Sequence, residues 1–68
     1  MNANKLKAKM IVNGLTIATT AELMGINKST LYRKLNGREK LTVNDAVQLK
    51  DILGLTDLEA LDIFLSQE

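Results

Sequence analysis

A short segment in the middle of the chain carries four side chains that can hydrogen-bond to nucleic acid: Lys28, Ser29, Tyr32 and Arg33. The two cations donate through several N–H groups, and the two hydroxyl groups both donate and accept. Leu31 and Leu35 lie four positions apart, so on a helix they share one face while the polar residues project from other faces. A helix with one buried face and a polar amino-terminal part fits the major groove of a duplex.

The flanking residues predict how this helix is positioned. Gly25 can adopt a positive φ angle, which a sharp corner between two helices requires. Ile26 is expected to be buried beside the corner. Asn27 is a suitable N-cap for a helix that spans about residues 28–35, and Gly37 ends that helix. The sequence therefore predicts two short helices joined by a tight turn.

Four residues around this turn follow one another at intervals of four, one and five positions: Ala21, Gly25, Ile26 and Leu31. This pattern resembles the helix-turn-helix of phage Cro and lambda-repressor-type transcription regulators. Three further segments look like the same family, so the likeness extends over nearly the whole chain: residues 29–37, 41–42 and 53–55. The resemblance implies one compact all-α domain, residues 1–68, with five helices and a helix-turn-helix formed by the second and third.

The resemblance also implies a function, which is sequence-specific binding of duplex DNA by a Cro-like repressor of a phage or prophage switch. Such a protein binds a palindromic operator and blocks the promoter by occlusion. The implied base-contacting residues are Lys28, Ser29, Thr30 and Arg33. Their chemistry agrees, because Arg can donate to both O6 and N7 of guanine and Thr offers a methyl group to thymine. The predicted phosphate-contacting residues flank this helix or follow it: Asn27, Tyr32, Asn36, Arg38 and Lys40.

Three positions have alternative interpretations. Tyr32 can equally be an aromatic residue at the edge of the core with its hydroxyl in water. Lys34 is expected to point away from the groove. Ile17 stands where the family often has a glutamine that binds a phosphate, and isoleucine cannot make that bond. Thr19 or the backbone amides at the start of the second helix are the substitutes that the sequence offers.

Charge is distributed unevenly along the chain, although the net charge is only +1. Residues 1–40 carry eight cations and two carboxylates, and residues 41–68 carry one cation and six carboxylates. Such a chain can present a basic face to a polyanion and an acidic face to solvent. Solvated helix faces that acquired different charges by chance are the alternative explanation.

Further helices are predicted from caps and apolar spacing. One spans residues 3–12 with Leu6, Met10 and Ile11 as its apolar stripe, and ends at Gly14. The next starts at Thr16 and ends at residue 24; because its β-branched body forms helices poorly, Ala21, Leu23 and Met24 must hold it by tertiary contacts. Capping boxes at Thr42 and Thr56 start the last two helices. In the fourth helix the expected inward stripe is Ala46, Leu49 and Leu53, and in the fifth Leu58, Leu61 and Leu65 form one apolar stripe.

The fifth helix is apolar on more than one face, because Ala60, Ile63 and Phe64 add to its leucine stripe. Val43 and Val47 likewise lie outside the main stripe of the fourth helix. A helix of this kind is usually buried on two sides. We therefore expect a homodimer through Ala60, Ile63 and Phe64, although these residues can also simply complete the core of the monomer.

Composition argues against several other classes. The chain has no histidine and no cysteine, so acid–base or nucleophilic catalysis and thiolate metal sites have few candidate residues, and we expect no catalytic residue, metal site, cofactor or small-molecule substrate. No membrane-spanning segment is predicted, and the absence of cysteine suits the cytoplasm of a bacterial host. The second functional hypothesis is a protein-interaction module, for example an antirepressor that uses the same fold to bind a partner repressor.

Overall fold

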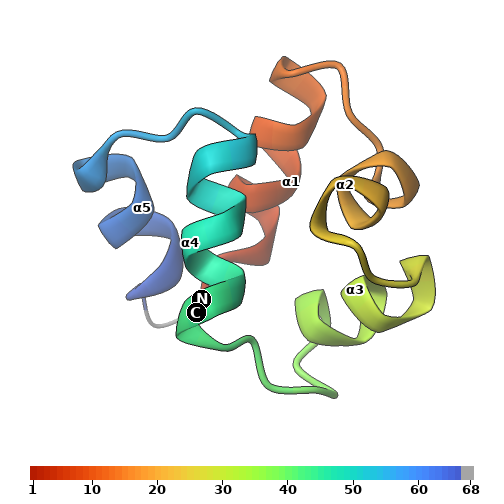
Figure 1. The fold of residues 1–68 in the computed structure, drawn as a ribbon. Helices are drawn as coiled ribbons and strands as arrows, with labels where there is room; N and C mark the ends of the chain where they lie inside the picture. Colours follow the sequence, from red (N-terminus) through yellow and green to blue (C-terminus); the bar gives the residue numbers. More distant parts are fainter. Residues whose placement is uncertain (67–68) are drawn as a thin grey trace.

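The computed structural model describes residues 1–66, which form five helices joined by short loops (Figure 1). The helices are α1 (Ala3–Val12), α2 (Ile17–Met24), α3 (Lys28–Leu35), α4 (Val43–Ile52) and α5 (Asp57–Phe64). No strand occurs among the described residues. The prediction of a five-helix, all-α chain is confirmed, and the helix ends lie within about a residue of the predicted ones.

Threonine begins three of the five helices. At Thr42 the backbone N–H donates to Asp45 Oδ2 at 2.9 Å, and the Asp45 N–H donates back to Thr42 Oγ1 at 3.0 Å. Thr56 and Glu59 form the same reciprocal pair at the start of α5. Each box satisfies two backbone N–H groups that a helix start otherwise leaves unpaired, and a cap is typically worth about 1 kcal/mol. The two capping boxes predicted from the sequence are therefore confirmed.

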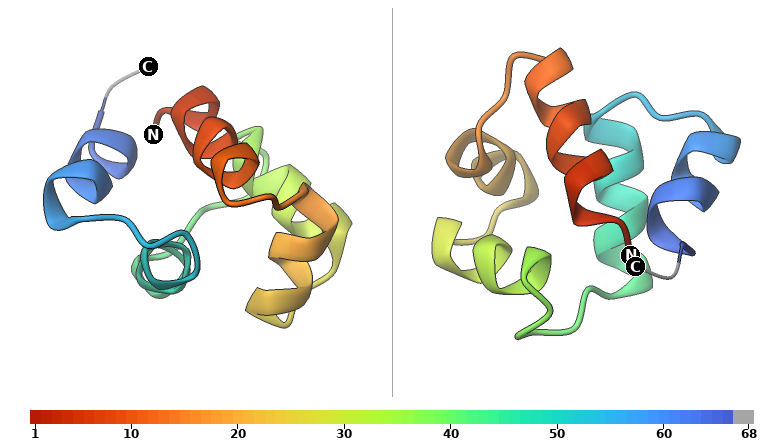
Figure 2. Two further views of the ribbon diagram at one scale, coloured as in Figure 1. Left: turned by 90° about the horizontal axis from the view of Figure 1, so that it is seen from above. Right: turned by 180° about the vertical axis from the view of Figure 1, so that it is seen from behind.

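α1 and α4 form the middle of the molecule. Seen from behind, α1 crosses the centre, with α2 and α3 on one side and α5 on the other (Figure 2). α2 packs against α1, α3 and α4, while α5 packs against α1 and α4. α3 packs chiefly against α2, so it lies at one edge of the molecule, across α4 from α5 (Figure 1).

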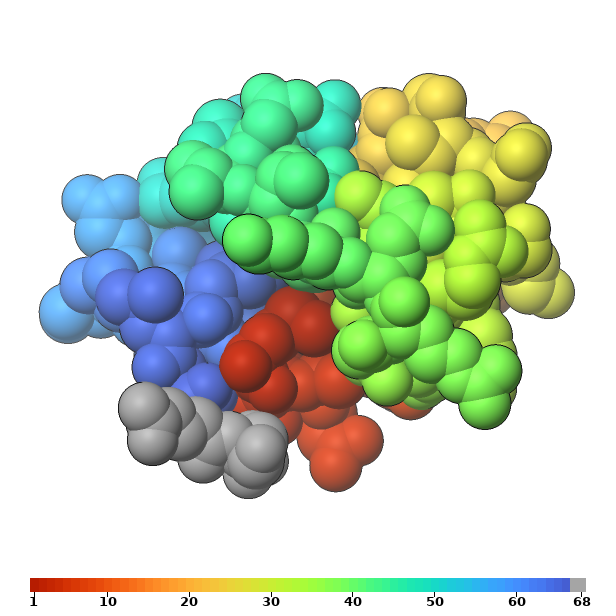
Figure 3. All heavy atoms as spheres, turned by 90° about the horizontal axis from the view of Figure 1, so that it is seen from below, coloured from red at the N-terminus to blue at the C-terminus, as the bar shows by residue number. Residues whose placement is uncertain are grey.

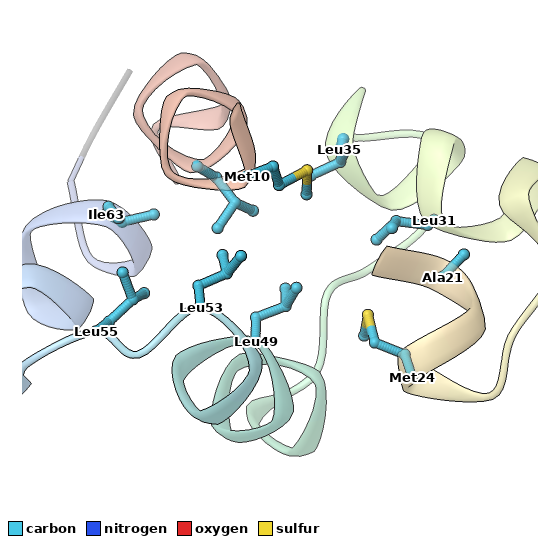
Figure 4. Close-up of a cluster of buried hydrophobic side chains, with 10 residues drawn as sticks. Met10, Ala21, Met24, Leu31, Leu35, Leu49, Leu53, Leu55 and Ile63 are labelled. Carbon is cyan, nitrogen blue, oxygen red and sulfur yellow. The ribbon is translucent and has the colours of Figure 1, made fainter. Parts of the chain in front are cut away.

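One hydrophobic core joins all five helices (Figure 4). Its most deeply buried members come from α1, α3, α4 and α5 respectively: Leu6, Leu31, Leu49 and Ile63. Leu15, Ile26 and Leu41 are half-buried in the loops and pack against this cluster, as predicted for Ile26. Because a fully buried leucine is typically worth several kcal/mol against alanine, these contacts determine where each helix lies.

The leucine stripe of α5 lies at the surface, and Ile63 and Phe64 complete the core instead, as the alternative interpretation expected. Leu58, Leu61 and Leu65 are 77%, 53% and 71% exposed, whereas Ile63 is 1% exposed and Phe64 is half-buried. Both sets have helical spacing, so periodicity alone cannot choose between them. Contacts with the amino-terminal segment make the choice. The Asn2 N–H donates to the Ile63 carbonyl at 2.8 Å, and Lys5 Nζ lies 2.6 Å from Asp62 Oδ2.

Two predicted core residues lie at the surface. Ile11 is 75% exposed and Leu23 is 60% exposed. In α2 the buried position is instead taken by Thr20, whose hydroxyl donates to the Thr16 carbonyl at 2.7 Å. A threonine can replace an aliphatic residue in a core when its hydroxyl is satisfied in this way.

Ion pairs fasten α1 to α5. Lys9 bonds to Glu59 and Lys5 bonds to Asp62. The hydrogen bond from Lys9, together with the backbone hydrogen bond from Thr56, lowers the pKa of Glu59 from 4.5 to about 2. The folded state therefore holds this carboxylate ionised at pH values where the unfolded chain begins to protonate it.

This difference predicts a loss of stability in acid. A carboxylate whose pKa is lower in the folded state stabilises the protein fully above its unfolded value of 4.5, and this contribution disappears as the pH falls towards about 2. Glu59→Gln keeps an acceptor for the capping box but cannot ionise. We expect the variant to have a lower midpoint of thermal unfolding at pH 7, and this midpoint to depend less on pH below 4.5, measured by circular dichroism.

Asp51→Asn is the control, because Asp51 is an exposed carboxylate without an ion pair in residues 1–66. It should change neither the midpoint nor its pH dependence. An unchanged pH dependence in Glu59→Gln would contradict this role.

Candidate nucleic-acid interface

A left-handed glycine makes the corner between α2 and α3. Gly25 has φ 75° and ψ 27°, and its N–H donates to the Glu22 carbonyl at 3.1 Å. The Ile26 N–H donates to the Ala21 carbonyl at 3.0 Å and closes the turn. A Cβ atom at Gly25 would meet no atom within 4 Å, so the backbone conformation, not lack of space, is what favours glycine here. Asn27 occupies the N-cap position of α3, but its side chain makes no capping hydrogen bond.

Two leucines anchor α3 to the core. Leu31 is fully buried and Leu35 is 5% exposed. At about 100° of rotation per residue, Ser29 and Arg33 project from the side of α3 opposite these leucines. Both residues are exposed to solvent, and Thr30 beside them is half-buried.

Lys28 lies on a different part of the α3 surface. It is exposed, and it shares a helix face with Tyr32, four residues later. Tyr32 is 52% exposed, which fits either of its two predicted roles. The predicted base-contacting residues therefore form one group of three (Ser29, Thr30 and Arg33), with Lys28 at the flank.

The loop after α3 supplies the remaining predicted contacts. Asn36, Arg38 and Lys40 are all exposed. Seen from below, this loop lies on the molecular surface directly beside α3 (Figure 3, green beside yellow-green). The loop is folded back by Gly37, which has φ 75°, and by hydrogen bonds from the N–H groups of Arg38 and Glu39 to the Arg33 carbonyl at 2.9 and 3.3 Å.

Lys34 takes no part in the exposed surface, as expected. Its Nζ lies 2.6 Å from Asp45 Oδ2, and its side chain is 11% exposed. Burial raises the pKa of Asp45, but the hydrogen bonds from Lys34 and Thr42 outweigh that effect and hold it below its ordinary value. This pair joins α3 to the start of α4.

Sequence reasoning missed one residue of the site, Glu39. Its Oε1 lies 3.3 Å from Arg33 Nε, and Arg33 Nη2 donates to Thr30 Oγ1 at 3.3 Å. A signal existed in the sequence, because Glu39 is the only carboxylate between residues 23 and 44. A lone acid among so many cations is positioned to pair with one of them.

Folding partly cancels the uneven charge of the chain. Lys5 and Lys9 are paired with carboxylates of α5, so the basic amino-terminal half is partly neutralised by the acidic carboxy-terminal half. Four cationic side chains have no ion-pair partner within residues 1–66: Lys7, Lys28, Arg38 and Lys40. Three of these four belong to α3 or the loop after it, so the free positive charge is concentrated there.

Thr19 is not a free phosphate ligand, contrary to one suggestion from the sequence. Its hydroxyl accepts from the Thr16 N–H at 2.8 Å and donates to the Thr16 carbonyl at 3.2 Å, so both functions are used within the cap. Ile17 is half-buried and packs against the core. The backbone amides at the start of α2 remain as the donors at that position.

Among residues 1–66, no three carboxylate, histidine or cysteine side chains come together as a group that can hold a metal ion. In the same part of the chain, every helix is too short or too polar to cross a membrane.

Comparison with known proteins gives no match: no family model fits the chain, and no curated protein or solved structure is significantly similar to it.

Proposed function

We propose that the protein is a sequence-specific DNA-binding regulator of transcription that acts as a Cro-like repressor, with α2 and α3 as its helix-turn-helix. The observation that carries this proposal is the position of α3. Two buried leucines anchor it at the edge of the molecule, while Ser29 and Arg33 point outwards and Lys28 is exposed at the flank of α3. With its side chains an α-helix is about 10–12 Å in diameter, so α3 can enter a major groove about 12 Å wide.

Base contacts and phosphate contacts have separate roles in this proposal. Arg33 donates to O6 and N7 of a guanine, and Ser29 and Lys28 contact neighbouring base edges. Arg38 and Lys40 neutralise phosphates on the strand beside α3 and release counterions, so affinity falls steeply with added salt. The phosphate contacts set the register of α3, and the base contacts determine which sequence is bound.

In this proposal the protein acts as a homodimer. The surface that supports dimerisation is a groove between α4 and α5. The groove has a volume of about 620 Å³ and is lined mainly by apolar side chains, among them Val43, Val47, Leu61, Phe64 and Leu65. The dimer surface expected from the sequence needs one correction, because Ile63 is buried in the monomer core and cannot contribute. Ala60 and Phe64 do line the groove.

A second copy of the chain is the occupant that the charges favour. Lys50 and Asp57 line the same groove. Lys50 Nζ lies 3.1 Å from Asp57 Oδ1, and the Asp57 side chain is 91% exposed. In a twofold dimer, such a pair can exchange partners between copies, so the surface is complementary to itself. Dimeric helix-turn-helix proteins place their recognition helices about 34 Å apart on a palindromic site, and the proposed dimer must reach this spacing. Such a dimer covers a promoter and excludes polymerase.

Selection of bound sequences from a random duplex pool tests the proposal directly. We expect a palindromic consensus with a guanine in each half-site. Arg33→Ala should weaken binding to that consensus by about 1–3 kcal/mol and remove the preference at one base pair of each half-site. An equal loss of affinity for consensus and random duplexes would contradict the base contact. Failure of the wild-type protein to enrich any sequence would overturn the proposed function.

Arg38 should act on affinity and not on sequence choice. Arg38→Ala removes a phosphate contact, so we expect binding to all duplexes to weaken alike and the salt slope to fall by about one unit per bound copy. Fluorescence anisotropy at several salt concentrations measures both. Lys5→Ala is the matched control, because it removes an equal charge from the side of α1 that faces α5. If both variants have the wild-type slope, Arg38 does not contact phosphate.

The same groove favours a second function, that of a module that binds a partner repressor. Four apolar residues that line it are at least half-exposed: Val43, Val47, Leu61 and Leu65. A protein of this kind would show no salt-dependent DNA binding and would occupy the groove with its partner. The selection experiment separates the two functions.

Dimerisation is tested by Leu61→Asp. Leu61 is 53% exposed, so a charge there leaves the core intact but opposes apolar contact in the groove. In sedimentation equilibrium we expect the wild-type protein to have twice the monomer mass and the variant to associate at least about tenfold more weakly. Leu58→Asp is the control, because Leu58 lies on α5 outside the groove and is 77% exposed. Equal effects of both variants would contradict the groove as the dimer surface.

A further inference from the structure

We propose that Glu39 and Thr30 are positioning residues that hold Arg33 in the orientation for reading a guanine, so that an acidic residue determines sequence specificity in a basic surface. This inference rests on the proposed DNA-binding function. It assigns a role to a carboxylate that has the wrong charge for contact with DNA, and it reassigns Thr30 from contacting a base to supporting the residue that does.

The contacts of Arg33 carry the proposal. Its Nε lies 3.3 Å from Glu39 Oε1, and its Nη2 lies 3.3 Å from Thr30 Oγ1. An arginine has five N–H donors, so three remain, two of them on Nη1. Within residues 1–66, Nη1 makes no hydrogen bond. The free end of the guanidinium can therefore still make a two-point contact with O6 and N7 of guanine.

Backbone geometry fixes the carboxylate that holds this arginine. The Glu39 N–H donates to the carbonyl of Arg33 itself, at 3.3 Å, after the turn at Gly37. Residue 39 is thus held beside residue 33 by its main chain as well as by its side chain. The other carboxylate oxygen, Oε2, lies 3.8 Å from Lys34 Nζ.

Lys34 connects this pair to the rest of the molecule. Its ammonium group bonds to Asp45 at 2.6 Å, and Asp45 caps α4. A continuous chain of polar contacts therefore runs from the start of α4 through Lys34 and Glu39 to Arg33. Through it, the orientation of the exposed guanidinium is determined by a helix that need not touch DNA.

Holding the Arg33 guanidinium in this way raises sequence specificity more than affinity. Arginine loses considerable side-chain entropy when it is fixed, and a preformed orientation reduces the loss that occurs on binding. The carboxylate also opposes an arrangement in which Arg33 turns away to pair with a phosphate, because that movement would leave Glu39 unpaired beside an anion. Glu39 therefore weakens binding to random sequences while it favours guanine.

The test is selection from a random duplex pool with Glu39→Gln, which keeps the shape of the side chain and removes its charge. We expect the preference for guanine at the base pair that Arg33→Ala identifies to fall by about tenfold, which corresponds to about 1.4 kcal/mol. Affinity for random duplexes should rise, because one repulsive charge is lost. Asp62→Asn is the matched control, since it also breaks an exposed ion pair, with Lys5, but lies on α5.

A second variant, Thr30→Val, removes the hydroxyl that Arg33 contacts and keeps the branched shape. It should relax the preference at the same base pair as Glu39→Gln. Relaxation at a different base pair would mean that Thr30 contacts a base itself, and would overturn its role as a support. Thermal unfolding of both variants shows that the fold is retained.

The outcomes separate this inference from the proposed function. If the wild-type protein selects a palindrome and Glu39→Gln keeps the same preference for guanine, the inference is wrong and the proposed function stands. If the wild-type protein selects nothing, both fall. If Asp62→Asn relaxes the same base pair as Glu39→Gln, the effect is one of net charge and the positioning role is wrong.

Discussion

Burial of Leu31 is the contact on which the rest of the candidate interface depends. This side chain has no exposed surface and joins α3 to the core formed by the other helices. A helix of eight residues is too short to be stable alone, so α3 exists because its leucine face is buried. The polar residues on its other side have a defined position only because this one face is fixed.

The helix starts show how a small chain without disulfides reaches a single structure. With 68 residues the core is limited, and local interactions must contribute a large share. Threonine caps begin α2, α4 and α5, and in two of them the partner carboxylate also binds a lysine from another helix. Asp45 and Glu59 thus combine a local role with a tertiary one, so these two capping boxes also fix how α4 and α5 pack against another helix.

The sequence predicted the helices well because their ends are determined locally, by residues such as Thr42, Thr56 and Gly25. It predicted the exposure of Lys28, Ser29 and Arg33 because Leu31 and Leu35 define the buried face of α3. It left the buried face of α5 open, because two sets of apolar residues have equally good spacing and distant contacts with α1 select Ile63. It failed for Glu39, because a side chain in a loop is paired by the path of the backbone, which residue spacing does not reveal.

Under the proposed function, the pairing of Lys5 and Lys9 with α5 has a consequence for how the protein responds to its own concentration. With these two lysines paired, the unpaired cations in the described part of the chain are Lys7 on α1 and Lys28, Arg38 and Lys40 at or beside α3. Under the proposed function, a single copy then holds a duplex weakly, and a long residence requires two copies together. Occupancy of a site would rise with the square of the amount of protein, so a gradual increase in synthesis would produce an abrupt change in gene expression.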